Sequence, residues 1–313
     1  MSVAVVRAAV ADWVDAFAGP DTKITVACSG GADSLALAIG CFAVLDESRL
    51  GAVTVDHQLQ DGSARRAVDV AEQLHEIGYR TVRIDTVTVE TGAGLEAGAR
   101  AARYRTLLPV DGAAVLLGHT ADDQAETVLL GLGRGSGPRS IAGMRPWNRP
   151  WGRPFLGVRR SDTESACREA GIEFWDDPHN VDPAFTRVRL RREVLPLMEE
   201  VLGGGVAPAL ARTADLLAED LEALDYLAAR VLAEVWQSGG VVDLEALAGH
   251  PVALRRRALR AWADAVGARA LTADHLVRLD SLAMGPRRTG AVRLPGAVDA
   301  VRTGTTLRAV PAG

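Results

Sequence analysis

The sequence predicts an α/β protein with a doubly wound parallel sheet, followed by a smaller, mainly helical C-terminal domain. Short β-branched runs alternate with amphipathic stretches of helical period in the first part of the chain, and this alternation is typical of parallel strands joined by helices. The composition shifts after the three glycines at 203–205. We therefore expect one domain at 1–205 and a second domain at 206–313.

The expected elements of the first domain follow from apolar periodicity and from glycine or proline at their ends. Strands are expected at 24–26, 50–55, 81–89 and 113–117, and helices at 5–18, 35–39, 63–77, 95–108 and 120–132. Ligands of doubly wound sheets bind at the carboxyl ends of the strands. The polar clusters at 29–34, 56–59 and 118–126 each follow a strand, so we expect all three at that edge.

The segment 133–154 interrupts the alternation, because it is rich in glycine, proline and arginine. Long connections of this kind are usually functional or disordered, and we expect a long mobile loop over the site. The residues 161–164, Ser-Asp-Thr-Glu, have the pattern of a capping box. They predict the start of a helix that ends near Gly171.

The C-terminal part has a different pattern. A long helix is expected at 208–236, two shorter helices at 251–266 and 272–283, and a small β-hairpin within 291–310. The apolar residues of the long helix recur at alternating spacings of four and three. This spacing is compatible with a coiled-coil dimer, but we favour core packing within a helical domain.

Composition narrows the class of protein. The chain has 313 residues, no apolar run of 18 residues and no pattern of a signal peptide, so we expect a cytoplasmic protein without a membrane span. Cys28, Cys41 and Cys167 are far apart in the sequence, which argues against disulfides and a thiolate zinc site. The net charge of −5 argues against nonspecific binding of polyanions but allows a local basic face. The oligomeric state stays open between monomer and homodimer.

The strand at 24–26 leads into a glycine-containing hexapeptide that precedes an apolar helix. Two glycines allow a tight turn and a close approach to a ligand, and the N-terminus of the helix favours an anion. The loop lacks the signatures of P-loop NTPases and of dinucleotide folds. A turn without a ligand is the simpler alternative, but the complete hexapeptide favours binding of pyrophosphate. Its residues are Ser29, Gly30, Gly31, Ala32, Asp33 and Ser34.

Asp33 would repel a phosphate unless Mg²⁺ bridged the two groups or the carboxylate capped local N–H groups. A second cluster lies at the end of the strand at 113–117, where His119, Asp123 and Glu126 are close enough to converge. Asp123 and Glu126 are three residues apart on a helix and share a face. They could bind a metal or the ammonium of a substrate, although acidic residues that complement a helix dipole are a common alternative.

A third cluster places Glu96, Arg100 and Arg103 on one face of the helix expected at 95–108. This cluster is either a row of surface ion pairs or an arginine face for phosphate and transition-state charge.

Together these motifs resemble the bacterial tRNA(Ile)-lysidine synthetases, which are PP-loop ATPases of the N-type with an adenine nucleotide alpha hydrolase-like fold. The resemblance covers about residues 20–200, and the remaining third fits a substrate-binding domain more loosely. The family usually has Ser where this chain has His179. The motifs that carry the resemblance are 29–34, Glu96 with 99–100 and 103–104, 118–127, 134–137, 153–156, 176–180 and 185–191.

The resemblance implies a carbon–nitrogen ligase that uses ATP and Mg²⁺. Such an enzyme adenylates the C2 carbonyl oxygen of the wobble cytidine in the CAU anticodon of tRNA(Ile). The ε-amine of L-lysine then displaces AMP and forms lysidine.

The resemblance also implies roles for single residues, and all of these are expectations here. The loop 29–34 would hold pyrophosphate, with Asp33 at Mg²⁺. Asp123 and Glu126 would hold the ammonium of lysine, while His119 would be a general base or an orienting group. Arg103, and less directly Arg100, would offset charge near the adenylate. Two sets of arginines would contact tRNA, the second of them equally well explained as a solvated basic face. The sets are Arg187, Arg189 and Arg191, and Arg255, Arg256, Arg257 and Arg260.

Three other functions use related sequence features. A tRNA thiolase on the same loop would need reactive cysteines or a cysteine-bound cluster, and the cysteine spacing here does not fit one. A nucleotide-sensing module would bind ATP without catalysis. The synthetase domain of an amidotransferase would need a glutaminase nucleophile region, which the sequence does not contain.

Overall fold

The computed structural model describes residues 1–56, 58, 62–87, 107, 114–135, 137–177, 181–286 and 289–312. The chain forms two compact units, Met1–Ala218 and Glu219–Gly313. The division falls inside the long helix α10 (Val206–Val235), so both units include a part of this helix. The functional division at 1–205 and 206–313 stays a prediction.

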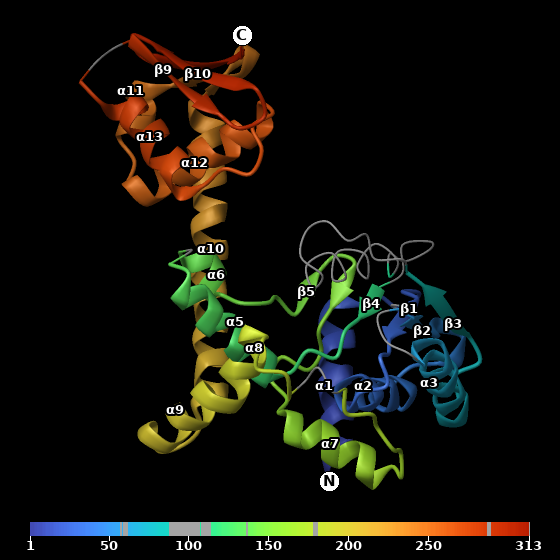
Figure 1. The fold of residues 1–313 in the computed structure, drawn as a ribbon. Helices are drawn as coiled ribbons and strands as arrows, with labels where there is room; N and C mark the ends of the chain where they lie inside the picture. Colours follow the sequence, from blue (N-terminus) through green and yellow to red (C-terminus); the bar gives the residue numbers. More distant parts are fainter. Residues whose placement is uncertain are drawn as a thin grey trace. The chain divides into compact units, whose positions relative to one another are not determined.

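The first unit contains a six-stranded sheet in the order β3-β2-β1-β4-β6-β5 (Figure 1). Neighbouring strands are parallel except for the antiparallel pair β5 and β6. The predicted doubly wound parallel sheet is therefore confirmed. Its strands are β1 (Ile24–Ala27), β2 (Leu50–Asp56), β3 (Val82–Thr86), β4 (Ala114–Leu116), β5 (Trp147–Asn148) and β6 (Trp151–Gly152).

Helices cover this sheet because their apolar faces need partners. The helix α2 is apolar on nearly all sides and packs against both α1 and α7, with Leu35 and Leu37 fully buried. A Cβ at Gly40 would lie 3.0 Å from the carbonyl oxygen of Val6, so glycine permits the close approach of α1 and α2. The helices are α1 (Ser2–Phe17), α2 (Ala32–Phe42), α3 (Ser63–Ile77), α5 (Ala121–Gly133), α6 (Pro138–Ile141), α7 (Arg160–Glu169), α8 (Thr186–Arg189), a π-helical turn (Leu190–Val194) and α9 (Leu195–Leu202).

Two local predictions lie outside the described residues or meet their edge. The helix expected at 95–108 is outside them except for Leu107, and the end of the strand expected at 81–89 is outside them as well. The helix predicted at 63–77 has the bounds of α3.

The prediction of a long mobile loop at 133–154 is wrong for the described part of that segment, which contains α6, β5 and β6. The strand β6 extends the sheet because it pairs with β4. Gly152 has no room for a Cβ, which would contact Leu116 and Trp13. The indole of Trp13 also lies against Trp147, with 5.3 Å between the ring centroids. Tryptophan packing therefore orders a segment whose glycines and prolines suggested a loop.

The capping box predicted at 161–164 is also wrong. The helix α7 starts at Arg160, its N-cap is Arg159, and no side chain caps it. The hydroxyl of Thr163 points instead to Asp33. A capping box is present on α5, between Thr120 and Asp123.

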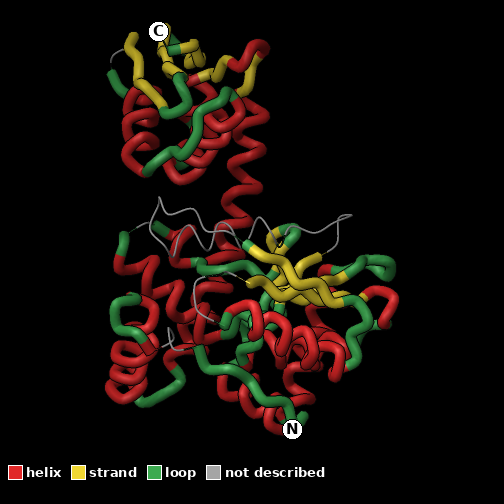
Figure 2. Tube along the Cα trace, turned by 45° about the vertical axis from the view of Figure 1, so that its right-hand side comes forward, coloured by secondary structure: helices red, strands yellow, loops and turns green. Residues whose placement is uncertain are grey.

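The second unit combines helices with a five-stranded antiparallel sheet, in the order β7-β8-β11-β10-β9 (Figure 2). The expected small hairpin is therefore part of a larger sheet. Trp262, Leu259, Leu279 and Leu307 lie at the centre of its core. The elements are α11 (Leu244–Ala248), α12 (Val252–Ala265), α13 (Ala273–Met284), β7 (Trp236–Gln237), β8 (Val241–Asp243), β9 (Thr289–Leu294), β10 (Val298–Thr303) and β11 (Thr306–Pro311).

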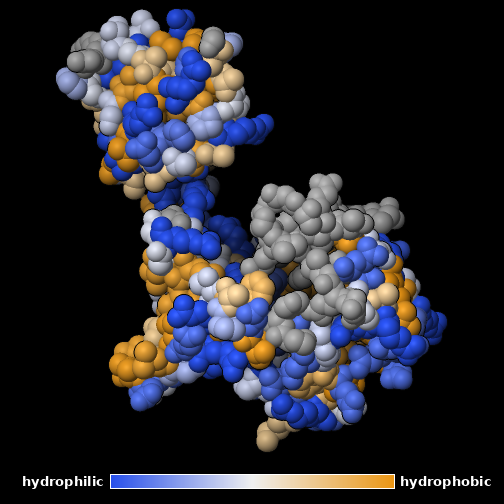
Figure 3. All heavy atoms as spheres, in the orientation of Figure 1, coloured by the Kyte–Doolittle hydropathy of each residue, from blue (hydrophilic) through white to orange (hydrophobic). Residues whose placement is uncertain are grey.

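Within the described residues, no single helix has both the length and the apolar composition needed to cross a membrane; only the bent pair Thr186–Leu202 and Val206–Val235 meets both criteria together. The helix α9 in this pair exposes an apolar surface (Figure 3). Leu197 is 59% exposed and Val201 is 71% exposed, so these side chains take no part in a core of the first unit.

Candidate active site

A cavity of about 360 Å³ lies at the carboxyl ends of β1, β2 and β4, and residues of the predicted polar clusters at 29–34 and 118–126 line it, whereas none of 56–59 is on the described wall. Its volume is within the usual range of small-molecule sites. Val53, Val55 and Leu117 form an apolar wall, which suits a flat heterocycle. Polar and charged residues also line the cavity, together with Gly31, namely Ser29, Asp33, Ser34, His119, Asp123, Arg160, Glu164, Asp176 and Arg191.

The predicted phosphate loop lies between β1 and α2, with Gly31 as the N-cap of α2. Gly30 has a φ of 82°, and a Cβ there would lie 2.5 Å from Cγ2 of Val70. Ser34 accepts a hydrogen bond from the backbone N–H of Ser29 at 3.1 Å and donates one to the carbonyl of Gly31 at 2.9 Å. Ser34 thus shapes the loop from inside, and the start of α2 with its favourable dipole belongs to the cavity wall.

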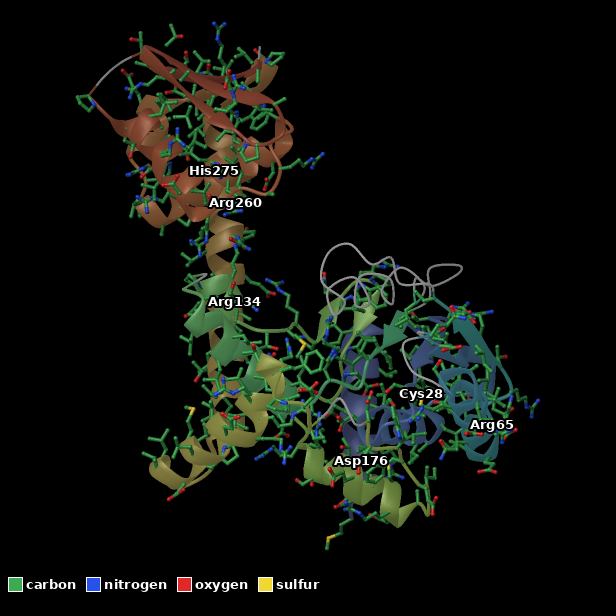
Figure 4. All side chains as sticks on the ribbon, in the orientation of Figure 1. Cys28, Arg65, Arg134, Asp176, Arg260 and His275 are labelled. Carbon is green, nitrogen blue, oxygen red and sulfur yellow. The ribbon has the colours of Figure 1, made fainter. Side chains whose placement is uncertain are left out.

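The end of β4 packs directly on this loop. A Cβ at Gly118 would lie 2.8 Å from the carbonyl oxygen of Asp33, so only glycine fits there without a shift. His119, the next residue, is on the cavity wall. Cys28, at the other end of the loop, is buried, and Figure 4 marks its position after β1.

Asp33 is held by two groups from α7. The hydroxyl of Thr163 donates to Oδ1 at 2.5 Å, and Nη2 of Arg160 lies 3.0 Å from Oδ2. Burial raises the pKa of Asp33 to about 6, although Arg160 and Thr163 favour the ionised form. The carboxylate is therefore mostly ionised at pH 7, because its pKa lies only slightly below that pH.

The start of α7 also forms hydrogen bonds with α5. Arg159 forms a forked pair with Asp122, and the backbone N–H of Arg160 donates to the same carboxylate at 2.8 Å. Nη2 of Arg160 also lies 3.4 Å from Oδ1 of Asp123. Sequence reasoning missed Arg159, Arg160 and Thr163. Their sequence could have suggested a functional role, because Arg159 and Arg160 stand at the start of a helix, where acidic residues are more common.

Asp123 and Glu126 come together as predicted, but a cation of the chain lies between them. Nε of Arg191 donates to Oε1 of Glu126 at 2.6 Å, and Nη2 donates to Oδ1 of Asp123 at 3.2 Å. Asp123 is on the cavity wall, whereas Glu126 is fully buried and lies outside the described wall. Arg187 approaches Glu126 at 3.6 Å.

The two carboxyls differ in their ionisation. Burial opposes the charge of Asp123, but Arg160, the N–H of Thr120, His119 and Arg191 outweigh it and lower the pKa. Burial dominates at Glu126 and raises its pKa despite the bond from Arg191. Asp123 is therefore the more firmly charged member of the pair.

The arginines expected to contact tRNA fall into two environments. Arg189 is exposed and pairs with Glu193 on the same helical face, whereas Arg191 belongs to the cavity wall. In the second unit, the set at 255–260 makes internal contacts. Arg255 and Arg256 share Asp280, Arg257 pairs with Asp225, and Arg260 donates to the carbonyl of Leu271 (Figure 4 labels Arg260).

Several predicted residues cannot be placed. Glu96, Arg100, Arg103 and His179 lie outside the described residues, so the role of Arg103 stays a prediction.

The described residues contain no group of three or more His, Cys, Asp or Glu side chains suited to a metal. Mg²⁺ typically takes one or two carboxylates and completes its shell with water and substrate phosphates. Asp33, one of four described acidic residues that line the cavity and the one beside the phosphate loop, therefore fits a Mg²⁺ that arrives with a nucleotide.

The parallel sheet and the loop after its first strand define a PP-loop domain, and the family model described as "PP-loop domain" matches residues 6–198. A second family model, the TilS substrate binding domain, matches residues 243–307. The chain belongs to the tRNA(Ile)-lysidine synthase family, as its curated relatives also show.

Three of these relatives are named tRNA(Ile)-lysidine synthase. The protein of Rhodococcus erythropolis is 52% identical over 95% of this chain and 90% of its own length. That of Nocardia farcinica is 50% identical over 95% of this chain and 93% of its own. That of Mycobacterium tuberculosis is 48% identical, with 93% and 90% covered.

Among solved structures, a U34-tRNA thiolase from Methanococcus maripaludis superposes with a TM-score of 0.54 at 14% identity. It covers 70% of this chain and 80% of the thiolase chain. This likeness supports the fold alone.

Proposed function

We propose that this chain forms lysidine in tRNA(Ile) with ATP and L-lysine, and that both chemical steps occur in the cavity beside the phosphate loop. The reaction is that of the family to which the chain belongs. The observation that carries the assignment of the site is one cavity whose wall contains the phosphate loop, Asp33 and Asp123, with the guanidinium of Arg160 contacting both carboxylates.

In the first step, the C2 carbonyl oxygen of the wobble cytidine attacks the α-phosphorus of ATP, and the bond to pyrophosphate breaks. The loop 29–34 would hold the pyrophosphate through its backbone and the helix N-terminus behind it. The apolar wall of Val53, Val55 and Leu117 would take the adenine. Arg160, close to Asp33, would add positive charge where the leaving group departs.

Asp33 would hold the Mg²⁺ that accompanies ATP, and the ion would supply positive charge against the leaving pyrophosphate. Thr163 and Arg160 orient the carboxylate of Asp33 for this task, because each binds one of its oxygens.

In the second step, the ε-amine of lysine attacks C2 and AMP leaves. Asp123 would hold an ammonium group of lysine by a charge-assisted hydrogen bond. Glu126 would contribute through Arg191, or directly where Arg191 gives way to the substrate. His119 on the cavity wall would accept the proton that the attacking amine releases.

Arginines of the first unit would contact phosphates of the tRNA, with Arg187 and Arg189 as the candidates. We expect the enzyme in the cytoplasm, where ATP, lysine and tRNA meet and thiols stay reduced. Burial raises the pKa of all three cysteines, which fits inert thiols.

Mass spectrometry of the nucleosides of tRNA(Ile), after incubation with ATP and isotopically labelled lysine, tests the proposal. We expect a labelled lysidine whose formation needs both ATP and the CAU anticodon. ATP binding without a modified nucleoside would favour a nucleotide-sensing module, and incorporation of sulfur would favour a thiolase.

A further inference from the structure

Three side chains on one face of α3 hold the wall of the candidate active site. Arg66, Val70 and Gln73 follow one another at helical spacing. Nε2 of Gln73 donates to the carbonyl of Glu173 at 2.7 Å. The guanidinium carbon of Arg66 lies 3.0 Å from the centre of the Trp175 ring. The segment from Glu173 to Trp175 is thus fastened to α3 at two points.

The same segment is bonded to the phosphate loop. The backbone N–H of Trp175 donates to the carbonyl of Gly30 at 3.0 Å. Gly30 itself contacts Val70, where a Cβ would lie 2.5 Å from Cγ2. The glycine is therefore enclosed between α3 and the Trp175 segment. Trp175 also contributes to the cavity wall beside Gly31, whereas Arg66 is not part of the described wall.

We propose that Arg66 and Trp175 are a positioning pair for ATP. The guanidinium that stacks on the indole holds the Trp175 N–H against the Gly30 carbonyl, and this bond fixes the phosphate loop in the conformation that receives pyrophosphate. Arg66 acts through Trp175 and touches no substrate. The inference rests on the proposed function, because it requires that the loop bind ATP.

The physical reason is the freedom of a glycine loop. Two adjacent glycines have many accessible conformations, and fixing them when the nucleotide binds would weaken affinity. A loop that is held beforehand avoids this loss. Loss of the stack should therefore weaken ATP binding, while the rate at saturating ATP changes little.

The experiment compares Arg66→Ala, Trp175→Ala and the double variant in tRNA adenylation with labelled ATP. Each single variant should raise the KM for ATP by about fivefold to tenfold, as expected for loss of a cation–π contact and the bond it supports. The KM for ATP of the double variant should not exceed the higher of the two single-variant KM values, because both changes remove the same contact. The KM values for tRNA and lysine should stay unchanged.

Arg65→Ala is the matched control. Arg65 is next to Arg66 on α3, pairs with Asp69 and is exposed (Figure 4). This variant should keep the wild-type KM for ATP. Arg66→Lys and Trp175→Phe, which keep a cation and a ring, should recover most of the affinity.

A wild-type KM for ATP in Arg66→Ala would overturn the proposal, and so would a double variant whose KM rises by the product of the two single effects. A lowered melting temperature with unchanged KM would assign the pair to stability alone. Failure of the proposed function looks different, because the wild-type protein would then form no adenylated tRNA.

Discussion

Nε of Arg191 lies 2.6 Å from Oε1 of Glu126, and the same guanidinium reaches Asp123 at 3.2 Å. A cation of the chain thus binds the two carboxylates that we expect to recognise lysine. Glu126 is fully buried behind this cation, and Asp123 alone of the pair is on the cavity wall. The two carboxylates are therefore expected to behave differently toward substrate and toward stability.

Arg191→Ala should lower the free energy of unfolding of the protein by about 3 kcal/mol, because removing one partner leaves Glu126 buried without its closest cation. Urea denaturation measures this loss. The double variant Arg191→Met with Glu126→Gln should recover most of it, since it removes both charges of the Arg191–Glu126 pair and leaves Asp123 with Arg160. Arg189→Ala, which breaks an exposed pair with Glu193, serves as a control with little expected change. Equal stability of Arg191→Ala and Arg189→Ala would contradict the buried pair.

Asp123→Asn should raise the KM for lysine by at least about tenfold, because it removes a charge-assisted hydrogen bond. Glu126→Gln should also raise it, but less, since Glu126 lies behind Arg191. Adenylation precedes the attack of the amine and should be largely spared in both variants. Labelled ATP reports the adenylate, and labelled lysine reports transfer. An equal loss of both half-reactions would assign the carboxylates to the loop or to Mg²⁺ instead.

Binding of tRNA should weaken as salt rises, despite the net charge of −5, because arginines displace counterions from phosphates. Arg189 is exposed, so Arg189→Ala should reduce the slope of log affinity against log salt by about 1. Arg191→Ala should leave the slope unchanged and impair lysine transfer. Filter binding at several salt concentrations gives the slopes. If Arg189→Ala keeps the wild-type slope, the phosphate contacts lie elsewhere.

Asp33→Asn should abolish adenylation and yet stabilise the protein near neutral pH. Burial raises the pKa of Asp33 to about 6 in the folded protein. Asp33 therefore contributes its full stabilisation to the free energy of unfolding below about pH 4, where it is protonated in both the folded and the unfolded state. This stabilisation is lost as the pH rises through 6. Asparagine does not titrate, and the variant should gain about 2–3 kcal/mol over the wild type between pH 4 and 7. Denaturant unfolding across this range measures the difference. A stability difference that is independent of pH would show that Asp33 does not titrate in this range.

The sequence alone predicted the parallel strands β1 to β4, the phosphate loop and the family, whereas β5 and β6 lie in a segment that it assigned to a loop. These features depend on residues that are contiguous in the chain. The run before the loop is β-branched, two glycines follow it, and the next helix is apolar enough to be buried. The helix at 63–77 was predicted with its observed bounds for the same reason, because periodicity and Gly78 are local signals.

Only the tertiary structure decided which charges meet. Thr163 reaches Asp33 across 130 positions, Arg191 reaches Glu126 across 65, and Arg160 reaches Asp123 across 37. Such pairs produce no periodic pattern in the sequence. The residues next to an arginine along the chain do not distinguish an arginine on a solvated face from one in a cavity. The low dielectric of a buried site makes these pairs strong, and burial is a property of the folded chain. The local pattern at 161–164 therefore suggested a helix cap, whereas folding turned Thr163 toward the carboxylate of the phosphate loop.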